Sequence, residues 1–460
     1  MYTMRALALY DPYSVYTNAV LEHLNSFRMI PGVKTAFMPF IKGVVPNVEF
    51  DFFDIILIHY SVRVAFKNYP EDFVERLQGY SGVKVLFIQD EYDLSETTRS
   101  FIEDAGIDLV FTCVPAGEIE KVYPAARFPD TQFVNVLTGY VPAMTPSDLS
   151  GTRALADRSV MIAYRGRELP YYYGDLGREK FTIAQMVKSH CNSKGITCDI
   201  ETTEDKRIYG AEWPAFVESS RATLITESGA NCFDWDGSLR HKVDQFLDGN
   251  PKADYETARA AIPELGRVDV HMNQISPRVF EAISSGTVLI GFEGSYAGVL
   301  EAGKHFISLR KDGGNIEDVL DQLKDMDLLE RLRRQAFEDV VGSGRWGYPE
   351  FARQIGQALA GSSKLSKLFP DPLPPQSLLT PEQALSSRQF RTITPIPGVV
   401  SSIPMGRPEP ILEGMLSPRV AKFLRTVISG IVHMLPPRLL KLVLRFMPGG
   451  LKNVLRHLSN

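Results

Sequence analysis

The sequence has few cysteines and lacks the glycine-rich motifs of the commonest nucleotide-binding loops. Its 460 residues include four cysteines, none spaced as a Cys-x-x-Cys pair: Cys113, Cys191, Cys198 and Cys232. This usage excludes a disulfide-stabilised scaffold and favours a reducing, cytosolic compartment. No Gly-x-Gly-x-x-Gly and no Walker lysine motif follows a strand-like run, so an NAD- or ATP-dependent enzyme is disfavoured.

Long apolar runs are missing as well. No stretch reaches the roughly 18 consecutive uncharged apolar residues that a transmembrane helix requires. The first apolar run meets Asp11 and Pro12 at once, which predicts a first strand and not a signal peptide. His190 and His241 have no partner at metal-ligand spacing, so we expect no metal site and no bound cofactor.

Charge is distributed unevenly along the chain. There are 50 Lys and Arg residues against 55 Asp and Glu, a formal net charge of −5. Residues 411–460 contain eight cations and one acid, Glu413, so they carry +7 and the preceding 410 residues carry −12. The acidic body argues against binding of nucleic acid, and the basic tail predicts an anionic partner of its own.

Short apolar runs alternate with helical patterns through most of the chain. Buried strands that alternate with helices predict an α/β fold with parallel sheets, here two Rossmann-like domains over residues 1–148 and 149–362. The strand-like runs are 5–10, 54–60, 84–92, 108–114, 159–166, 222–229, 287–294 and 305–309, and the main helical patterns are 15–27, 73–80, 180–195, 278–286 and two closing helices within 315–342.

The pattern stops after residue 362. Ten of the chain's 30 prolines lie between Ser366 and Pro410, which predicts an extended linker over 363–416. Residues 417–460 read as basic amphipathic helices with cations on a narrow face, a pattern typical of helices that lie in a membrane interface. Packing of these helices on the body or on another subunit is the alternative.

Polar side chains stand where three of the first strands end. In an open α/β sheet, ligands bind at the carboxyl ends of the strands. His59 has a side chain suited to deprotonating a bound hydroxyl group, and a buried structural histidine is the alternative. Of Asp90 and Glu91, we expect one to cap the next helix and the other to act as the base or to bind an acceptor.

The segment 278–290 predicts a nucleotide-binding helix. Ionised Glu281 can accept both hydroxyls of a ribose, and Arg278 one turn earlier can reach a phosphate. A surface salt bridge is the alternative for Glu281. The glycine-punctuated loop that follows can cradle a diphosphate with its backbone N–H groups. Glu227 also follows a strand and can touch donor or acceptor, whereas Asp234 and Asp236 read as a turn.

Several segments together carry a resemblance to a known family. The stretches IHYSVR (58–63), FIQDEY (87–92), YRGRELPYYYGDLGREK (164–180), TESGANCFDWDG (226–237) and NQISPRVFEAISSGTVLIGFEGSYAGVLEAGKHFISLRKD (273–312) resemble bacterial GT-B glycosyltransferases of the family 1 type. That group has an R-x-F-E-A-x-x-x-x-T pattern, a YSGVL loop and an HYIPLKKD strand. The resemblance covers about residues 50–355 and implies two Rossmann-like domains facing each other across a cleft.

The resemblance also implies roles for individual residues. Glu281 matches the glutamate that binds the ribose of the donor, and Arg165, Arg167 and Lys180 match the cations that neutralise the diphosphate leaving group. Tyr296, Gly298 and Val299 fall in the loop that matches YSGVL. One departure stands out, because relatives that retain stereochemistry place an acid where this chain has Asn273.

We therefore expect a glycosyltransferase that moves a sugar from a nucleotide-diphosphate donor to a hydroxyl of a bacterial surface glycan or glycolipid. Placed cations suit this chemistry, since the departing nucleoside diphosphate gains negative charge in the transition state. The expected location is the cytoplasmic face of the cell membrane, reached through residues 417–460. A nucleotide-sugar epimerase or hydrolase of the same architecture and a non-catalytic glycan-binding scaffold are the alternatives.

Overall fold

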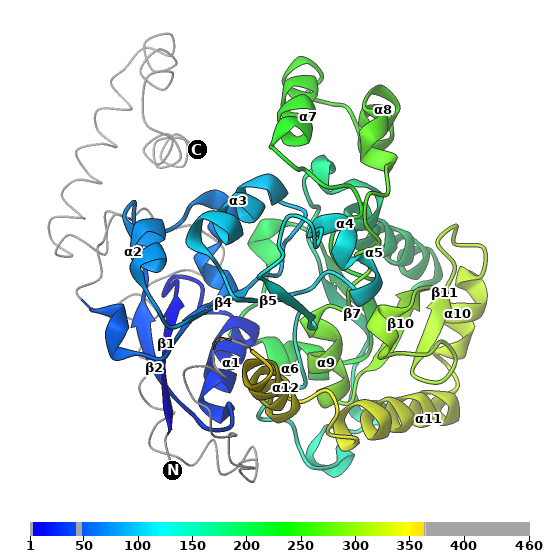
Figure 1. The fold of residues 1–460 in the computed structure, drawn as a ribbon. Helices are drawn as coiled ribbons and strands as arrows, with labels where there is room; N and C mark the ends of the chain where they lie inside the picture. Colours follow the sequence, from blue (N-terminus) through cyan, green and yellow to red (C-terminus); the bar gives the residue numbers. More distant parts are fainter. Residues whose placement is uncertain (1–2, 43–47, 211, 363, 365–460) are drawn as a thin grey trace, which may run out of the picture. The chain divides into compact units, whose positions relative to one another are not determined.

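Two parallel β-sheets made of short apolar strands form the framework (Figure 1). The computed structural model describes residues 3–42, 48–210, 212–362 and 364. The first sheet has the strand order β2-β1-β3-β4-β5-β6 and contains β1 (Met4–Tyr10), β2 (Val33–Pro39), β3 (Ile55–Ile58), β4 (Val83–Phe87), β5 (Leu109–Thr112) and β6 (Gln132–Asn135). The second has the order β11-β10-β9-β7-β8 and contains β7 (Val160–Arg165), β8 (Cys198–Glu201), β9 (Ser220–Ile225), β10 (Val288–Phe292) and β11 (Phe306–Leu309).

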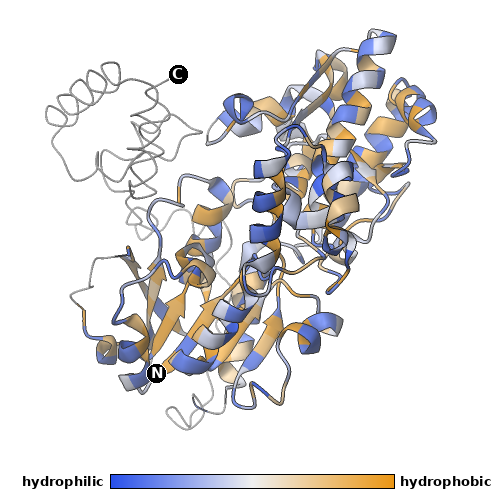
Figure 2. Ribbon diagram, turned by 90° about the horizontal axis from the view of Figure 1, so that it is seen from above, coloured by the Kyte–Doolittle hydropathy of each residue, from blue (hydrophilic) through white to orange (hydrophobic). Residues whose placement is uncertain are grey.

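Helices connect these strands and cover the sheets. They are α1 (Asn18–Ser26), α2 (Phe73–Gly79), α3 (Ser95–Ala105), α4 (Ile119–Val122), α5 (Gly174–Lys194), α6 (Glu212–Glu218), α7 (Ser238–Gly249), α8 (Tyr255–Ala261), α9 (Pro277–Ser284), α10 (Ile316–Gln322), α11 (Met326–Ala336) and α12 (Tyr348–Ala360). The longest helix, α5, ends at Gly195, whose φ of 65° gives the left-handed cap that glycine adopts without strain. In Figure 2 the strands of the first sheet are hydrophobic, and the helices around them carry hydrophilic residues.

The predicted α/β class with two parallel sheets is confirmed. Three strands were missed, β2, β6 and β8, and all three lie at the edge of a sheet. An edge strand has a neighbour on one side only, so its residues are partly exposed. Val33 is the one buried residue of β2, and β6 has no buried residue. The search for continuous apolar runs finds central strands such as β3, whose four residues are all buried.

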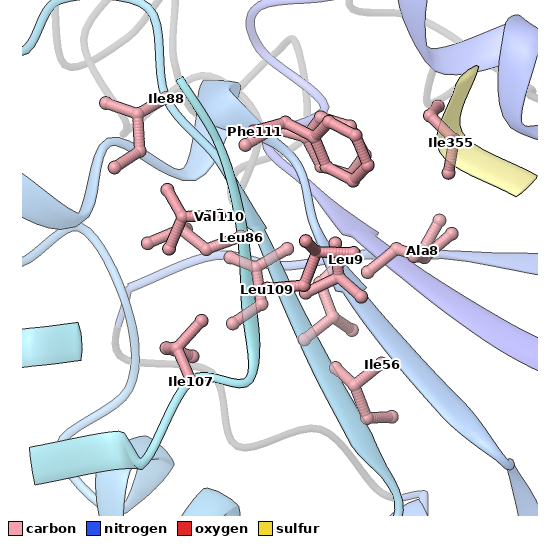
Figure 3. Close-up of a cluster of buried hydrophobic side chains, with 14 of the residues drawn as sticks. Ala8, Leu9, Ile56, Leu86, Ile88, Ile107, Leu109, Val110, Phe111 and Ile355 are labelled. Atoms are coloured by element: carbon pink, nitrogen blue, oxygen red, sulfur yellow. The ribbon is translucent and has the colours of Figure 1, made fainter. Parts of the chain in front are cut away.

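Helix α12, the last in the described part of the chain, packs into the core of the first sheet. Phe351 and Ile355 belong to the same buried cluster as Ala8 and Phe111, and Figure 3 shows Ile355 beside Ala8 and Phe111. The ring of Phe351 lies 4.6 Å from that of Tyr140 and 4.8 Å from that of His23. The chain therefore returns to the first sheet after completing the second, although the sequence pattern assigned this helix to the second domain.

The other predicted boundaries stay predictions. Residues 365–460, which hold almost all of the expected linker (363–416) and the whole basic tail (417–460), lie outside the described residues. In the part of the chain that the structure describes, no helix combines the length and the apolar character needed to cross a membrane.

Replacing Phe351 with alanine should lower the free energy of unfolding by about 3–5 kcal/mol, because a fully buried aromatic ring leaves a cavity. Phe351 is 1% exposed, whereas Phe52 is 64% exposed and provides the matched control. Phe52→Ala should change the stability by no more than about 0.5 kcal/mol. Urea unfolding followed by circular dichroism measures both changes, and an equal effect of the two would contradict the docking of α12 in the core.

Candidate functional site

A cavity of about 500 Å³ lies where strands of both sheets end. Ser61 follows β3 and Gln89 follows β4, and they line the cavity with Arg167, which follows β7, and Ser228, which follows β9. Ligands bind at the carboxyl ends of parallel strands, where the loops converge. Volumes of roughly 300–1,000 Å³ are typical of sites for small molecules.

Cations dominate the wall of this cavity. Among the described residues, five cationic side chains line it and Asp90 is the sole carboxylate, the cations being Arg63, Arg167, Lys180, Arg207 and Arg278. Arg167, Lys180, Arg207 and Arg278 come from segments around the second sheet, and Arg63 comes from the loop after β3. Such an excess of positive charge makes the cavity an anion-binding site.

Lys180 lies among the cations of the second sheet. Its Nζ donates a hydrogen bond to Ser228 Oγ at 2.6 Å. Burial, followed by the positive charges of Arg278 and Arg167, lowers the pKa of Lys180 to about 8. Helix α5 supplies Lys180 and the first turn of α9 supplies Arg278, so two helices bring like charges together at one point.

Asp90 is the acid of the cavity. It is exposed at the end of β4, and its Oδ1 accepts a hydrogen bond of 2.7 Å from the hydroxyl of Tyr92. It also interacts electrostatically with Lys180, where its charge raises the pKa of the amine. An exposed carboxylate that faces a ligand cavity can accept a proton from a bound hydroxyl group.

His59 lies behind the cavity and not on its wall. It is 0% exposed, and its Nε2 lies 3.0 Å from Nδ1 of His23. Its Nδ1 accepts a hydrogen bond from the backbone N–H of Ser61 at 3.1 Å and lies 2.8 Å from the hydroxyl oxygen of the same residue. Burial, and then the neighbouring His23, hold the pKa of His59 well below its ordinary value. This environment keeps the imidazole neutral and makes it a cap for the turn after β3.

Glu91 points the opposite way from Asp90. It is 1% exposed, and its Oε1 accepts hydrogen bonds from the hydroxyl of Thr112 and, at 2.7 Å, from the backbone N–H of Cys113. Burial raises the pKa of Glu91 to about 7. The structure thus places Glu91 as a link between the ends of β4 and β5, outside the cavity wall.

Glu227 holds the loop that was expected to cradle a diphosphate. Its Oε1 accepts from the backbone N–H groups of Ser295 and Tyr296, at 2.8 and 2.9 Å, and its Oε2 accepts from Asn273 Nδ2 at 2.6 Å. These two N–H groups are therefore already bonded to a carboxylate. Tyr296 and Val299 are buried, and neither they, Glu227 nor Gly298 belongs to the described lining of the cavity.

Arg165 and Glu281 are also bonded to protein groups. Arg165 is 8% exposed and pairs with the carboxylate of Asp199 at 2.8 Å. Glu281 Oε2 accepts from Trp213 Nε1 at 2.6 Å, and burial raises the pKa of this acid. Arg165 directly precedes Gly166 and Glu281 lies one turn after Arg278, and both Gly166 and Arg278 line the cavity. Arg165 and Glu281 themselves do not.

The structure therefore unites some of the predicted site residues and separates others. Asp90, Arg167, Lys180 and Arg278 meet at one cavity, and the structure places the other predicted residues outside its lining: His59, Glu91, Arg165, Glu227, Glu281, Tyr296, Gly298 and Val299. The roles predicted for both groups stay predictions. Sequence reasoning did not single out Arg63 or Arg207. Arg63 ends the IHYSVR segment, which was a usable signal, whereas Arg207 stands in a charged loop without any motif.

The segment 233–237 joins the two sheets beside the cavity. The backbone N–H of Asp234 donates to Tyr92 O at 3.0 Å, and that of Glu96 donates to Trp235 O at 2.8 Å. The predicted turn is confirmed, because Asp236 Oδ1 accepts from the N–H of Ser238 at 3.0 Å. Within the described ranges, no group of three or more His, Cys, Asp or Glu side chains is arranged to hold a metal ion.

Acetylation of Lys180 should follow a pH profile with a midpoint near pH 8, about two units below an ordinary lysine. Arg167→Gln removes a neighbouring positive charge, so the midpoint should rise. Arg334→Gln, at an exposed position away from the cavity, should leave it unchanged. Limited reaction with acetic anhydride and mass spectrometry measures the profile, and a midpoint that Arg167→Gln does not move would contradict the described grouping of charges.

Comparison with known proteins adds the following findings. No family model matches the chain, and no curated protein matches it. Solved structures similar to it include HepE from Anabaena in complex with UDP, at 11% identity and a TM-score of 0.42 over 77% of this chain and 99% of HepE. Sucrose-phosphate synthase from Thermosynechococcus elongatus has 11% identity and a TM-score of 0.37, over 77% of this chain and 98% of the synthase.

TarM is a third similar structure, at 11% identity and a TM-score of 0.37, and here 66% of this chain spans 54% of TarM, about half its length. Because these scores lie below 0.5, the fold assignment rests on the two parallel sheets described above and not on the likenesses. The chain is thus a two-sheet α/β protein with a cationic cavity at the carboxyl ends of its strands.

Proposed function

We propose that this protein is a glycosyltransferase that transfers a sugar from a nucleotide-diphosphate donor to a hydroxyl group. One observation carries the proposal: the carboxylate of Asp90 shares a cavity with a cluster of cations at the carboxyl ends of the strands of two parallel sheets. An enzyme of this class needs both features, because it must neutralise a departing diphosphate and accept a proton from the attacking hydroxyl. HepE, a similar structure, is described in complex with UDP-glucose.

The donor side of the proposal consists of Lys180, Arg167 and Arg278. A guanidinium group presents two parallel donors to phosphate oxygens, and an ammonium group adds a compact positive charge. All three cations line the same cavity, and the charges of Arg278 and Arg167 both act on Lys180. One anionic group can therefore interact with all three. We further propose that their charge takes the part that a divalent metal plays in other transferases, so that the reaction proceeds without a bound metal or cofactor.

Glu281 remains our proposed contact to the ribose. It stands one turn after Arg278 on α9, whose first residues line the cavity. Its carboxylate is engaged by Trp213, but an ionised carboxylate has acceptor sites for more than one donor. Helix α9 would then hold phosphate and ribose side by side.

Asp90 is the general base of our proposal. Of the three predicted candidates, it lines the cavity, whereas His59 and Glu91 are bonded within the core. The hydrogen bond from Tyr92 fixes the orientation of its carboxylate. His59 and Glu91 then support the loops on either side of the base.

The acceptor is, in this proposal, a bacterial surface glycan or glycolipid, and the sugar transferred is a hexose. Membrane association of the basic residues 417–460 would bring the enzyme to such an acceptor at the cytoplasmic face. The argument for this part is the charge and the amphipathic pattern of the tail.

A panel of nucleotide sugars tests the proposed class. One of the UDP-, GDP- or TDP-sugars should raise the melting temperature, since a ligand that binds only the folded state stabilises it. That donor should then release its nucleotide when a glycolipid extract is added. A CMP-sugar, which carries a single phosphate, completes the panel, and a shift with it alone would contradict a diphosphate donor. Release of free sugar without an acceptor would favour a hydrolase, an altered sugar an epimerase, and binding without turnover a scaffold. No shift with any donor would refute the proposal.

Lys180→Met should weaken binding of UDP at least about tenfold, because it removes a charge-assisted hydrogen bond to phosphate. Lys188→Met is the matched control on the same helix, where Lys188 pairs with Glu201 at 2.9 Å. Isothermal titration calorimetry measures both changes. An equal loss in the two variants would contradict the assigned position of the diphosphate.

The same titration predicts a pH dependence. An anion raises the pKa of Lys180 from about 8, so binding takes up a proton near this pH and the affinity falls as the pH rises through it. The heat should depend on the ionisation enthalpy of the buffer in the wild type and not in Lys180→Met. An affinity that increases above pH 8 would contradict the assignment.

Asp90→Asn should lower turnover about 10²–10⁴-fold while donor binding stays close to that of the wild type, because the amide cannot accept the proton. Asp248→Asn, at an exposed position on α7, controls for the loss of one negative charge. Nucleotide release with the glycolipid extract measures the rates. Full activity of Asp90→Asn would assign the base to another residue.

A further inference from the structure

Arg63 stands apart from the other cations of the cavity. It belongs to the loop after β3 and lies between two short 3-10 turns, Tyr60–Val62 and Val64–Phe66. Strand β3 pairs directly with β4, whose end carries Asp90. Arg63 and the proposed base therefore share the wall that the first sheet contributes, whereas Lys180, Arg167 and Arg278 belong to the second sheet.

The acids near Arg63 are already bonded to other groups. Its Nη2 lies 4.0 Å from Asp93 Oδ2, but Asp93 pairs with Arg240 at 2.6 Å and accepts from the hydroxyl of Tyr173 at 3.0 Å. Asp11 also interacts with Arg63, and its carboxylate accepts from the N–H of Tyr13 at 2.9 Å and from the hydroxyl of Ser14 at 2.8 Å. These two acids offset part of the positive charge of Arg63, whose side chain remains 51% exposed.

The backbone holds Arg63 in a conformation that few residues other than glycine adopt. Its φ is 51° and its ψ is 62°, in the left-handed region, and Lys67 at the end of the next turn has a φ of 49°. The guanidinium carbon lies 4.3 Å from the ring centre of Phe66. The buried His59 caps the same turn through Ser61. The loop thus holds a half-exposed arginine at the cavity in a strained backbone conformation.

We propose that Arg63 binds an anionic group of the acceptor, a phosphate or a carboxylate, and that the enzyme is therefore selective for anionic acceptors. This inference rests on the proposed transferase function. The cations of the second sheet are sufficient for the diphosphate of the donor, which leaves Arg63 for the second substrate. Its guanidinium can bind either anion through two parallel hydrogen bonds.

Three sugars that share the glucose ring and differ in the group at C6 test the inference on the UDP-saturated full chain: glucose 6-phosphate, glucuronate and glucose. Calorimetry should show at least one of the two anionic sugars binding about tenfold tighter than glucose, as expected for one charge-assisted contact. The better of the two anions identifies phosphate or carboxylate as the preferred group.

The variant Arg63→Gln should abolish this preference and change the Kd for UDP less than about twofold. Arg334→Gln, which removes a cation at an exposed position outside the cavity lining, should keep the preference. Circular dichroism and the unchanged binding of UDP establish that Arg63→Gln is folded.

The possible failures are distinguishable. If the wild type does not bind UDP or another nucleotide diphosphate, the proposed function itself fails. If UDP binds but neither anionic sugar is preferred, or if the preference survives in Arg63→Gln, this inference alone is overturned. If Arg63→Gln weakens the binding of UDP as strongly as Lys180→Met does, Arg63 belongs to the donor site and the inference is again overturned.

Discussion

The repulsion among three cations in one half-buried cavity is the constraint on which the rest of the site depends. Lys180, Arg167 and Arg278 are brought together from α5, from the end of β7 and from the start of α9. Burial and the repulsion of the neighbouring cations lower the pKa of Lys180 to about 8. The cavity therefore disfavours the charged form of this amine. An anion reverses both effects, because it replaces lost hydration and offsets the repulsion. The packing of the second sheet thus prepares a site for a multiply charged anion.

A layer of buried polar groups supports the loops around this site. His59 caps the turn that carries Arg63, Glu91 joins the ends of β4 and β5, and Glu227 binds the loop at Ser295 and Tyr296. Each of these groups is bonded to backbone N–H groups, which satisfies donors that would otherwise lie unpaired in the interior. They act through the loops, which they hold in position, whereas Asp90 is exposed and lines the cavity, as the proposed general base must.

The fold class was predictable from the sequence because central strands of parallel sheets are buried on both faces and appear as continuous apolar runs. Edge strands such as β2 lack that signature. The docking of α12 on the first sheet was not predictable either, since the amphipathic pattern of a helix does not say which sheet covers its apolar face. The pairing of Phe351 with His23 and Tyr140 is long-range information that only the folded chain contains.

The site was predictable in part for a related reason. Asp90 and Glu91 are neighbours in the loop after β4, which ends at Phe87. The sequence pattern is the same whichever of them faces the cavity, and the folded loop decides that Asp90 lines the cavity and that Glu91 is buried. Arg278 was predicted because it lies one turn before Glu281 in a helical pattern, and Lys180 was predicted from the family resemblance of residues 164–180. Arg63 was missed because its importance depends on a left-handed turn.

The central claim is that the diphosphate of a nucleotide sugar binds among Lys180, Arg167 and Arg278. A crystal structure of the full chain with UDP-glucose, or with whichever donor stabilises the protein, tests this claim most directly. The account predicts phosphate oxygens within hydrogen-bond distance of Lys180 Nζ and of the Arg278 guanidinium, with the sugar directed toward Asp90. A nucleotide bound away from these cations, or a cavity that stays empty at saturating donor, would contradict it.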